Sequence, residues 1–131
     1  MVTLTTNEVA ISAESTYQAQ YSDPMQNQYV FSYRIQIENK SARPIQLLAR
    51  RWEVIDAAGD RRQVEGEGVV GQQPVILPGQ SYEYNSWVQF ATRQGAMQGN
   101  YIMARKDRRG RELFFQADVP RFLHVAPEAL N

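Results

Sequence analysis

The sequence predicts an all-β fold, an antiparallel β-sandwich formed by a single domain over residues 1–131. Three observations support this prediction. In one long segment large aromatic or aliphatic residues occupy every second position. Turn-forming residues recur at about ten-residue intervals, and no segment has a capped helical pattern. A chain of 131 residues is large enough to bury a core without disulfides or structural metals. We expect the core to span about residues 9–123 and residues 124–131 to form a tail.

The first strands are predicted from alternation. Val9, Ile11 and Ala13 alternate with polar residues, and residues 14–21 are expected to continue as an edge strand. The next strand has the clearest pattern in the chain, because large residues occupy every second position. We expect its core-facing residues to be Tyr29, Phe31, Tyr33, Ile35 and Ile37.

The segment from Ile45 to Asp56 is ambiguous, because its apolar residues recur both at three-to-four and at two-residue spacing. Its neighbours on both sides are predicted strands, so we interpret it as a strand with a bulge and Trp52 as a buried anchor. Residues 39–44 and 57–60 are the predicted turns on either side.

Strands are also predicted at residues 81–89, 97–105 and 112–119, with a turn at 107–110 and a short tail from Pro120 onward. Trp87 falls on the opposite face of its strand from Tyr82 and Tyr84. Val30 and one of Phe114 and Phe115 also fall outside the main alternation. If these side chains cluster, they form an exposed apolar patch, so Trp87 is a candidate for an interaction surface.

Gly66, Gly68 and Gly71 form the pattern G-x-G-x-x-G. A dinucleotide site needs a helix directly after this pattern, so that the helix N-terminus can bind the pyrophosphate. Pro74 and Pro78 exclude such a helix, since proline removes backbone donors and disfavours helical geometry in the residue before it. Where a ribose-binding acid is expected, the sequence has residues 89–91, which are Gln, Phe and Ala.

We therefore interpret the three glycines as positive-φ positions in a shaped loop. Glycine-rich backbone can also form an anion-binding nest without a helix, although Glu65 and Glu67 would oppose a phosphate there. Both interpretations make Gly66, Gly68, Gly71 and Pro74 a candidate binding loop.

Several segments of the chain resemble the ApaG family. These are residues 66–74 (GEGVVGQQP), 77–84 (LPGQSYEY), 31–39 (FSYRIQIEN), 47–52 (LLARRW) and 95–101 (GAMQGNY). The resemblance covers about residues 9–123. It implies an immunoglobulin-like, fibronectin type III-like sandwich and a loose link to cobalt and magnesium tolerance. Related domains in F-box proteins and a polymerase-delta-interacting protein imply protein binding, and the family's pattern contains no catalytic residues to transfer.

The composition gives no support for an enzyme. There is no cysteine, and His124 is the only histidine, so a thiolate nucleophile or a histidine- or cysteine-rich metal site cannot be built. We interpret His124 as an ordinary surface or interface residue, and we expect no cofactor and no metal. The start of the sequence has no secretory pattern and no apolar run is long enough to span a bilayer, so a cytoplasmic location is expected.

Charged residues give two further candidates. Acidic residues in 53–67 are interleaved with arginines, which favours salt-bridged surface charge over a hard-cation site. A basic hairpin is predicted to carry Arg105, Lys106, Arg108, Arg109 and Arg111. It could contact an anionic partner, but the formal net charge of zero disfavours nucleic acid, which also calls for an exposed aromatic side chain.

Two functions are consistent with these observations. The favoured one is a non-enzymatic module that binds another protein, or a second copy of itself, through a sheet face and the glycine loop. The alternative is a small-ligand module that holds a pyrophosphate-containing nucleotide or a divalent cation at the G-x-G-x-x-G loop.

Overall fold

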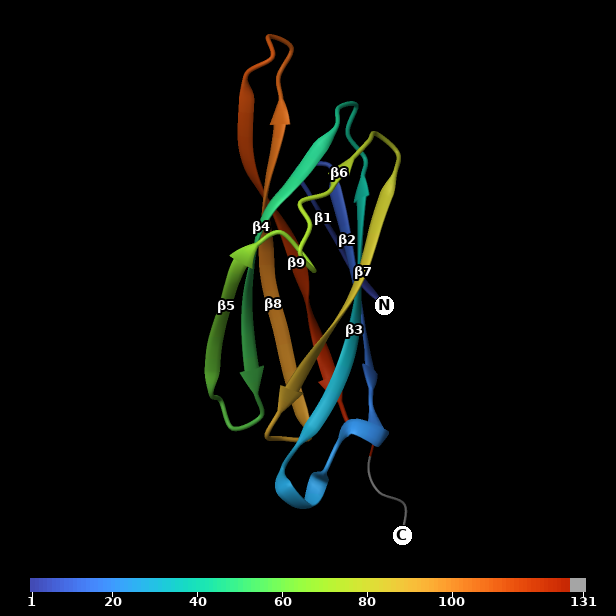
Figure 1. The fold of residues 1–131 in the computed structure, drawn as a ribbon, viewed down its shortest axis with the longest axis vertical. Helices are drawn as coiled ribbons and strands as arrows, with labels where there is room; N and C mark the ends of the chain where they lie inside the picture. Colours follow the sequence, from blue (N-terminus) through green and yellow to red (C-terminus); the bar gives the residue numbers. More distant parts are fainter. Residues whose placement is uncertain (128–131) are drawn as a thin grey trace.

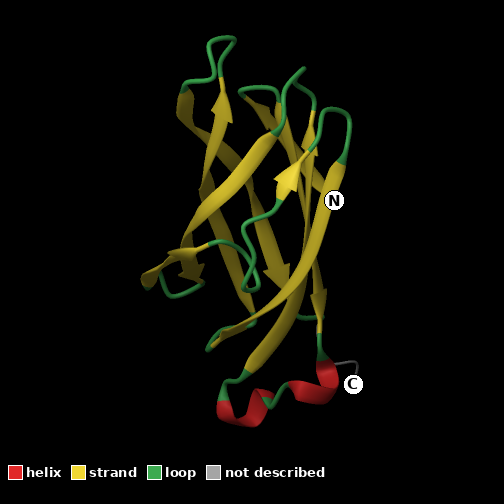
Figure 2. Ribbon diagram, turned by 45° about the horizontal axis from the view of Figure 1, so that its top comes forward, coloured by secondary structure: helices red, strands yellow, loops and turns green. Residues whose placement is uncertain are grey.

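The computed structural model describes residues 1–127 as two antiparallel β-sheets packed face to face, which confirms the predicted all-β sandwich (Figures 1 and 2). The first sheet has the strand order β1-β2-β3-β7, and the second has the order β5-β4-β8-β9, with the short strand β6 paired to β4. No helix in the described part of the chain is long and apolar enough to cross a membrane.

The strands of the first sheet are β1 (Val2–Thr6), β2 (Val9–Tyr17), β3 (Tyr29–Asn39) and β7 (Ser81–Phe90). Those of the second are β4 (Ile45–Asp56), β5 (Arg61–Glu67), β6 (Val75–Ile76), β8 (Gln94–Lys106) and β9 (Glu112–Val125). Two single-turn 3-10 helices, η1 (Ala19–Tyr21) and η2 (Pro24–Gln26), connect β2 to β3 and are red in Figure 2.

The core follows the predicted alternation in the middle of the chain. All five core-facing residues predicted for β3 are buried, because that strand lies between β2 and β7 with one face toward the second sheet. The ambiguous segment is strand β4, its bulge lies between Leu47 and Ala49, and Trp52 is buried. Strand geometry and burial thus agree with the sequence pattern here.

The N-terminal region differs from the prediction. The sequence does not predict β1, whose side chains are nearly all exposed and which pairs with β2 along its whole length. β2 is therefore an inner strand, and the edge strand expected at residues 14–21 is wrong. The strand ends at Tyr17, and η1 follows.

The tail predicted from Pro120 onward is also wrong, because β9 continues to Val125. Gly99 pairs with Val119 but Met97 pairs with Phe122, so β9 has one more residue than β8 between these pairs. This bulge reverses the alternation and turns Phe122 and His124 toward the core, a shift that a strict period of two does not predict. The last four residues of the predicted tail, 128–131, lie outside the described residues.

Candidate functional site

The glycine loop begins inside a strand. Gly66 lies in β5 opposite Arg50 and is not among the residues with positive φ, so the turn interpretation is wrong for this glycine. A Cβ atom at Gly66 would lie 2.9 Å from the Arg50 guanidinium group. That group donates hydrogen bonds to the carbonyl oxygens of Glu67 (3.1 Å) and Gly68 (2.9 Å). A side chain at position 66 would therefore have to displace the Arg50 guanidinium group from its present place.

The other two glycines have the positive φ expected of turn residues, +62° at Gly68 and +77° at Gly71. Val69 and Gln72 exchange backbone hydrogen bonds of 2.8 and 3.0 Å, which closes a tight turn between them. A Cβ atom at Gly68 would lie 2.2 Å from the Gln72 carbonyl oxygen. Gly68 therefore has both a conformational and a steric requirement for glycine.

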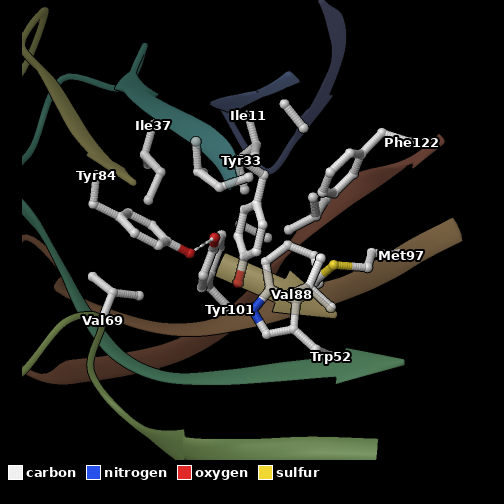
Figure 3. Close-up of a cluster of buried hydrophobic side chains, with 14 of the residues drawn as sticks. Ile11, Tyr33, Ile37, Trp52, Val69, Tyr84, Val88, Met97, Tyr101 and Phe122 are labelled. Carbon is white, nitrogen blue, oxygen red and sulfur yellow. Dashed lines mark hydrogen bonds between the residues drawn. The ribbon is translucent and has the colours of Figure 1, made fainter. Parts of the chain in front are cut away.

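The loop contributes a side chain to the core. Val69 is fully buried and belongs to the same core cluster as Tyr84 and Tyr101 (Figure 3). The loop joins edge strand β5 to β6, which both belong to the second sheet, so Val69 enters the core before the chain crosses to β7 in the first sheet. This packing is a structural reason for the glycine pattern.

The backbone donors of the loop are largely engaged. The N–H of Gly68 donates to the Leu48 carbonyl oxygen at 2.8 Å, and those of Val69 and Gln72 bond to each other's carbonyl groups. Pro74 has no N–H, and its carbonyl oxygen accepts from the Leu47 N–H at 3.0 Å. An anion-binding nest needs adjacent free N–H groups, and three of the loop's donors already have protein partners.

Two of the acidic residues near this loop, Glu53 and Asp56, are used in local contacts. Glu53 forms an ion pair with Arg61 at 2.7 Å, and Asp56 accepts the N–H groups of Ala58 and Asp60. Across the described residues, no three or more His, Asp or Glu side chains converge on a point that could hold a metal ion. The arrangement is that of salt-bridged surface charge and turn caps.

The predicted basic hairpin joins β8 to β9 and projects beyond the other strands at the top of Figure 1. Its predicted residues are brought together at and beside the tip, but they are not equivalent. The Arg105 guanidinium lies 4.5 Å from the centre of the Phe115 ring and 3.9 Å from the Glu8 carboxylate. Lys106, Arg108, Arg109 and Arg111 are exposed, and their side chains bond to no other residue in the described range.

The structure adds two residues to this hairpin that the sequence did not assign. Arg43 reaches it from the turn before β4 and donates a long hydrogen bond (3.5 Å) to the Lys106 carbonyl oxygen. Phe114 is the exposed member of the Phe114–Phe115 pair, with 65% of its surface accessible. Arg43 is distant in sequence, so only strand pairing could have revealed its position.

Trp87 lies on the outer face of β7, the last strand of the first sheet, and is 54% exposed. The Tyr21 ring, from η1, meets it edge-on with the ring centroids 5.4 Å apart. Ser32 is opposite Trp87 and Val30 is opposite Gln89, so Val30 is a diagonal neighbour of Trp87. Phe114 belongs to the other sheet, so a single patch containing both Phe114 and Trp87 does not form.

His124 is fully buried, so its interpretation as a surface or interface residue is wrong. Its Nδ1 atom lies 2.7 Å from the Ser15 hydroxyl, and four aromatic rings surround it, those of Phe31, Tyr33, Phe90 and Phe122. Burial lowers the pKa of His124 to about 4. A Ser–His pair is part of some catalytic triads, but this imidazole faces the core, where it cannot meet a substrate from solvent.

A polar hollow of about 490 Å³ lies on the outer face of the second sheet, and no pattern in the sequence predicted it. Strand pairing places Arg51, Asn100 and Asp118 in one row across β4, β8 and β9. The Asn100 Oδ1 atom has no hydrogen-bond partner. The hollow carries both signs of charge, including Arg121 and Glu65, and nothing in it favours one ligand.

Comparisons with known proteins agree with the resemblance seen in the sequence. A family model described as the ApaG domain matches residues 19–105. The chain is 39% identical over 131 residues to a protein named Protein ApaG from Anaeromyxobacter dehalogenans, with all of both chains covered. It is 41% identical to the protein of that name from Thiobacillus denitrificans, covering 95% of this chain and 94% of the other. A crystal structure of a Bordetella pertussis protein superposes with a TM-score of 0.85 at 35% identity, covering 92% of this chain and 95% of that one.

Proposed function

The chain belongs to the ApaG family, and from this membership and its surface we propose that it is a non-enzymatic β-sandwich module that binds another protein. The observation that carries the proposal is the exposed Trp87 on the outer face of β7. Tryptophan is enriched at the centres of protein interfaces, where its large apolar surface is removed from water. A contiguous group of exposed apolar side chains, rather than a single one, is the usual mark of an interaction site.

The surroundings of Trp87 favour an interface. Tyr21, which is 60% exposed, meets the indole ring edge-on, so the two rings already hold each other in one arrangement. Val30 is half-buried beside them on the same face. The polar side chains of Gln18 and Ser32 bond to each other at 2.8 Å close to this group. An apolar centre with a polar rim is the usual composition of a protein-binding surface.

The chemistry of this patch favours a partner segment with an apolar or aromatic anchor. β7 is an edge strand, so an extended partner segment could also pair along its backbone. One carbonyl oxygen of that edge, that of Gln89, already accepts from the Arg62 side chain at 3.1 Å. The sheet face is therefore the primary surface of the proposal, and strand addition is secondary.

The experiment compares Trp87→Ala with Phe114→Ala, which removes another exposed aromatic side chain, on the other sheet. Immobilised wild type and both variants are incubated with nuclease-treated lysate of the native cells, and recovered proteins are quantified by mass spectrometry. Sedimentation velocity of each purified protein tests whether the partner is a second copy. A partner kept by wild type and Phe114→Ala but lost by Trp87→Ala supports the proposal. Equal recovery by all three, with no Trp87-dependent self-association, refutes it.

The link to cobalt and magnesium tolerance is proposed to act through such a partner. The described residues offer no converging set of metal ligands, which is why we do not assign the link to direct binding. The immunoglobulin-like relationship and the cytoplasmic location remain predictions from the sequence.

The alternative function, binding of a pyrophosphate-containing nucleotide or divalent cation at the glycine loop, is supported by the motif and by the positive φ of Gly68 and Gly71. It is disfavoured by the inward use of the loop's N–H groups. A direct titration, described in the Discussion, separates the two functions.

A further inference from the structure

The hairpin between β8 and β9 concentrates positive charge in a chain whose formal net charge is zero. We call it the basic hairpin; its cationic residues are Arg43, Arg105, Lys106, Arg108, Arg109 and Arg111. The carboxylates beside them are those of Glu8, Asp107 and Glu112. Glu8 lies near Arg105 and Asp107 accepts hydrogen bonds in the turn, but the three carboxylates are only half as many as the six cations, so the hairpin keeps an excess of positive charge.

The tip of the basic hairpin is held in one conformation. The Asp107 carboxylate accepts the N–H groups of Arg109 (2.8 Å) and Arg111 (2.9 Å), and the Asp107 N–H donates to the Arg111 carbonyl oxygen at 2.8 Å. Gly110, with φ of +78°, completes the turn. The arginines are thus mounted on a fixed two-stranded ribbon, which lowers the entropic cost of binding a ligand with them.

An exposed aromatic ring stands beside these charges. Phe114 pairs with Ala104 and Glu112 pairs with Lys106, so the phenyl ring is on the same face as the Lys106 side chain. An exposed aromatic beside cationic side chains is the combination with which proteins bind single-stranded nucleic acid, through base stacking and phosphate contacts. The sequence alone could not say which of the two phenylalanines is exposed, and the structure does.

A cavity of about 240 Å³ opens at the base of the same hairpin. Its apolar lining comes from Pro44, Ile45, Val75 and Ala104, and its cationic lining from Arg43, Arg105 and Lys106. Because Ala104 is the strand partner of Phe114, the apolar lining and the phenyl ring belong to adjoining positions of the sheet. A flat apolar group next to an anionic group fits this combination, and a nucleotide has both.

We propose that the basic hairpin binds single-stranded nucleic acid, with phosphates on Arg43, Lys106 and Arg108–Arg111 and a base stacked on Phe114. RNA and DNA share this chemistry. An acidic peptide would use the cations but would leave the phenyl ring and the apolar lining unused. This surface is separate from the Trp87 patch, so the inference does not depend on the proposed protein partner.

The test is fluorescence anisotropy of labelled oligo-U RNA and oligo-dT DNA of about 15 nucleotides, titrated with purified protein at about 50 mM salt. Saturable binding is expected, with a slope of log K against log salt of about −2 to −3.5, as three to five phosphate contacts would give. Phe114→Ala should weaken binding by about fivefold or more with an unchanged slope. Arg109→Ala should weaken binding and make the slope smaller by about 0.7.

Matched controls come from elsewhere on the chain. Arg51→Ala removes an exposed arginine that, like Arg109, has no side-chain partner in the described range, and Trp87→Ala removes an exposed aromatic of the first sheet. Both should bind the oligonucleotides as wild type does, and all variants should keep the wild-type circular dichroism. Loss of partner capture by Trp87→Ala with intact oligonucleotide binding would show that the two surfaces act independently.

Three results would overturn the inference. One is no saturable binding at about 100 µM of folded protein, since even non-specific binding is tighter than that at low salt. Another is a labelled poly-glutamate peptide of equal length binding as tightly as the RNA, which would assign the surface to an acidic protein. The third is Phe114→Ala binding as well as wild type, which would remove the base contact.

Discussion

The hydroxyl groups of Tyr84 and Tyr101 lie 2.5 Å apart in the core and join the two sheets, because Tyr84 belongs to β7 and Tyr101 to β8 (Figure 3). Burial is the main cause that raises the pKa of both phenols well above the ordinary value, so both stay protonated at any physiological pH. One hydroxyl therefore donates and the other accepts. This is a polar contact in the cluster that also contains Val69 of the glycine loop.

Tyr101→Phe should lower the free energy of unfolding by about 1 to 3 kcal/mol, because it leaves the buried Tyr84 hydroxyl without this partner. The double variant Tyr84→Phe/Tyr101→Phe should lose less than the sum of the two single variants, since it leaves no orphaned group. Urea denaturation measures all three. Strictly additive losses would mean that the two hydroxyls do not depend on each other.

Stability should fall between about pH 6.5 and pH 4 because of His124. Its pKa is lowered to about 4 in the folded protein by burial, against an ordinary value of 6.5. Between these pH values His124 binds a proton in the unfolded chain but stays neutral in the folded protein. The free energy of unfolding is therefore highest above pH 6.5 and falls as pH is lowered toward 4. The loss is of the order of 3 kcal/mol, at about 1.4 kcal/mol per pKa unit.

His124→Phe is the comparison for this prediction, because it keeps an aromatic ring among its aromatic neighbours and removes the titrating group. Urea denaturation at a series of pH values should show a smaller loss for the variant than for wild type. Other groups contribute equally to both proteins, so the difference between the two pH profiles reports His124. Parallel pH profiles would contradict the assignment.

Gly68 and Gly71 provide a matched pair of glycine substitutions in one loop. Both have positive φ, but an added Cβ meets the Gln72 carbonyl oxygen only at Gly68 and has open space at Gly71. Gly71→Ala should therefore cost about 1 kcal/mol of conformational strain, and Gly68→Ala substantially more. Thermal unfolding of the two variants checks the order. Equal losses of stability in the two variants would mean that the Val69–Gln72 turn can shift to make room for the Cβ atom at position 68 without a cost in free energy.

A titration with ATP, a dinucleoside polyphosphate, Mg²⁺ and Co²⁺ should leave the amide resonances of Gly66, Gly68 and Gly71 unshifted. The physical reason is that the N–H groups of Gly68, Val69 and Gln72 already donate to protein carbonyl oxygens. Two-dimensional amide NMR reports each glycine separately, and Gly59, in a turn outside the loop, is the internal control. Localised and saturable shifts in the loop would restore the small-ligand function.

The sequence predicted most clearly the strands in which the alternation of buried and exposed residues is not interrupted by a bulge. Strand β3 alternates without interruption because both its neighbours are strands and one face is buried throughout. β9 could not be predicted beyond Pro120, because its bulge shifts the alternation and because Gly99 approaches the Arg51 carbonyl so closely that a Cβ would lie 2.0 Å away. β1 gave no signal, since a strand with mostly exposed side chains has no apolar face to detect.

The candidate sites were predictable as residue groups but not as surfaces. Consecutive residues such as Arg108 and Arg109 identify a cationic turn directly from the sequence. The addition of Arg43 depends on strand pairing across more than sixty positions, and the burial of His124 depends on the bulge before it. The edge-on contact of Tyr21 with Trp87 depends on a 3-10 turn that periodicity does not reveal.

The pairing of the chain's first strands with its last has a consequence for biosynthesis. β9 packs against β1 and β2, and the Ser15–His124 hydrogen bond joins positions 109 residues apart. The ribosome synthesises β1 and β2 long before β9, the strand that packs against them, because β9 is the last of the described strands in chain order. The nascent chain must therefore carry an open apolar face until β9 has emerged, and folding is then completed by a long-range step. Chaperone occupancy of ribosome-bound chains should accordingly persist until β9 has left the exit tunnel.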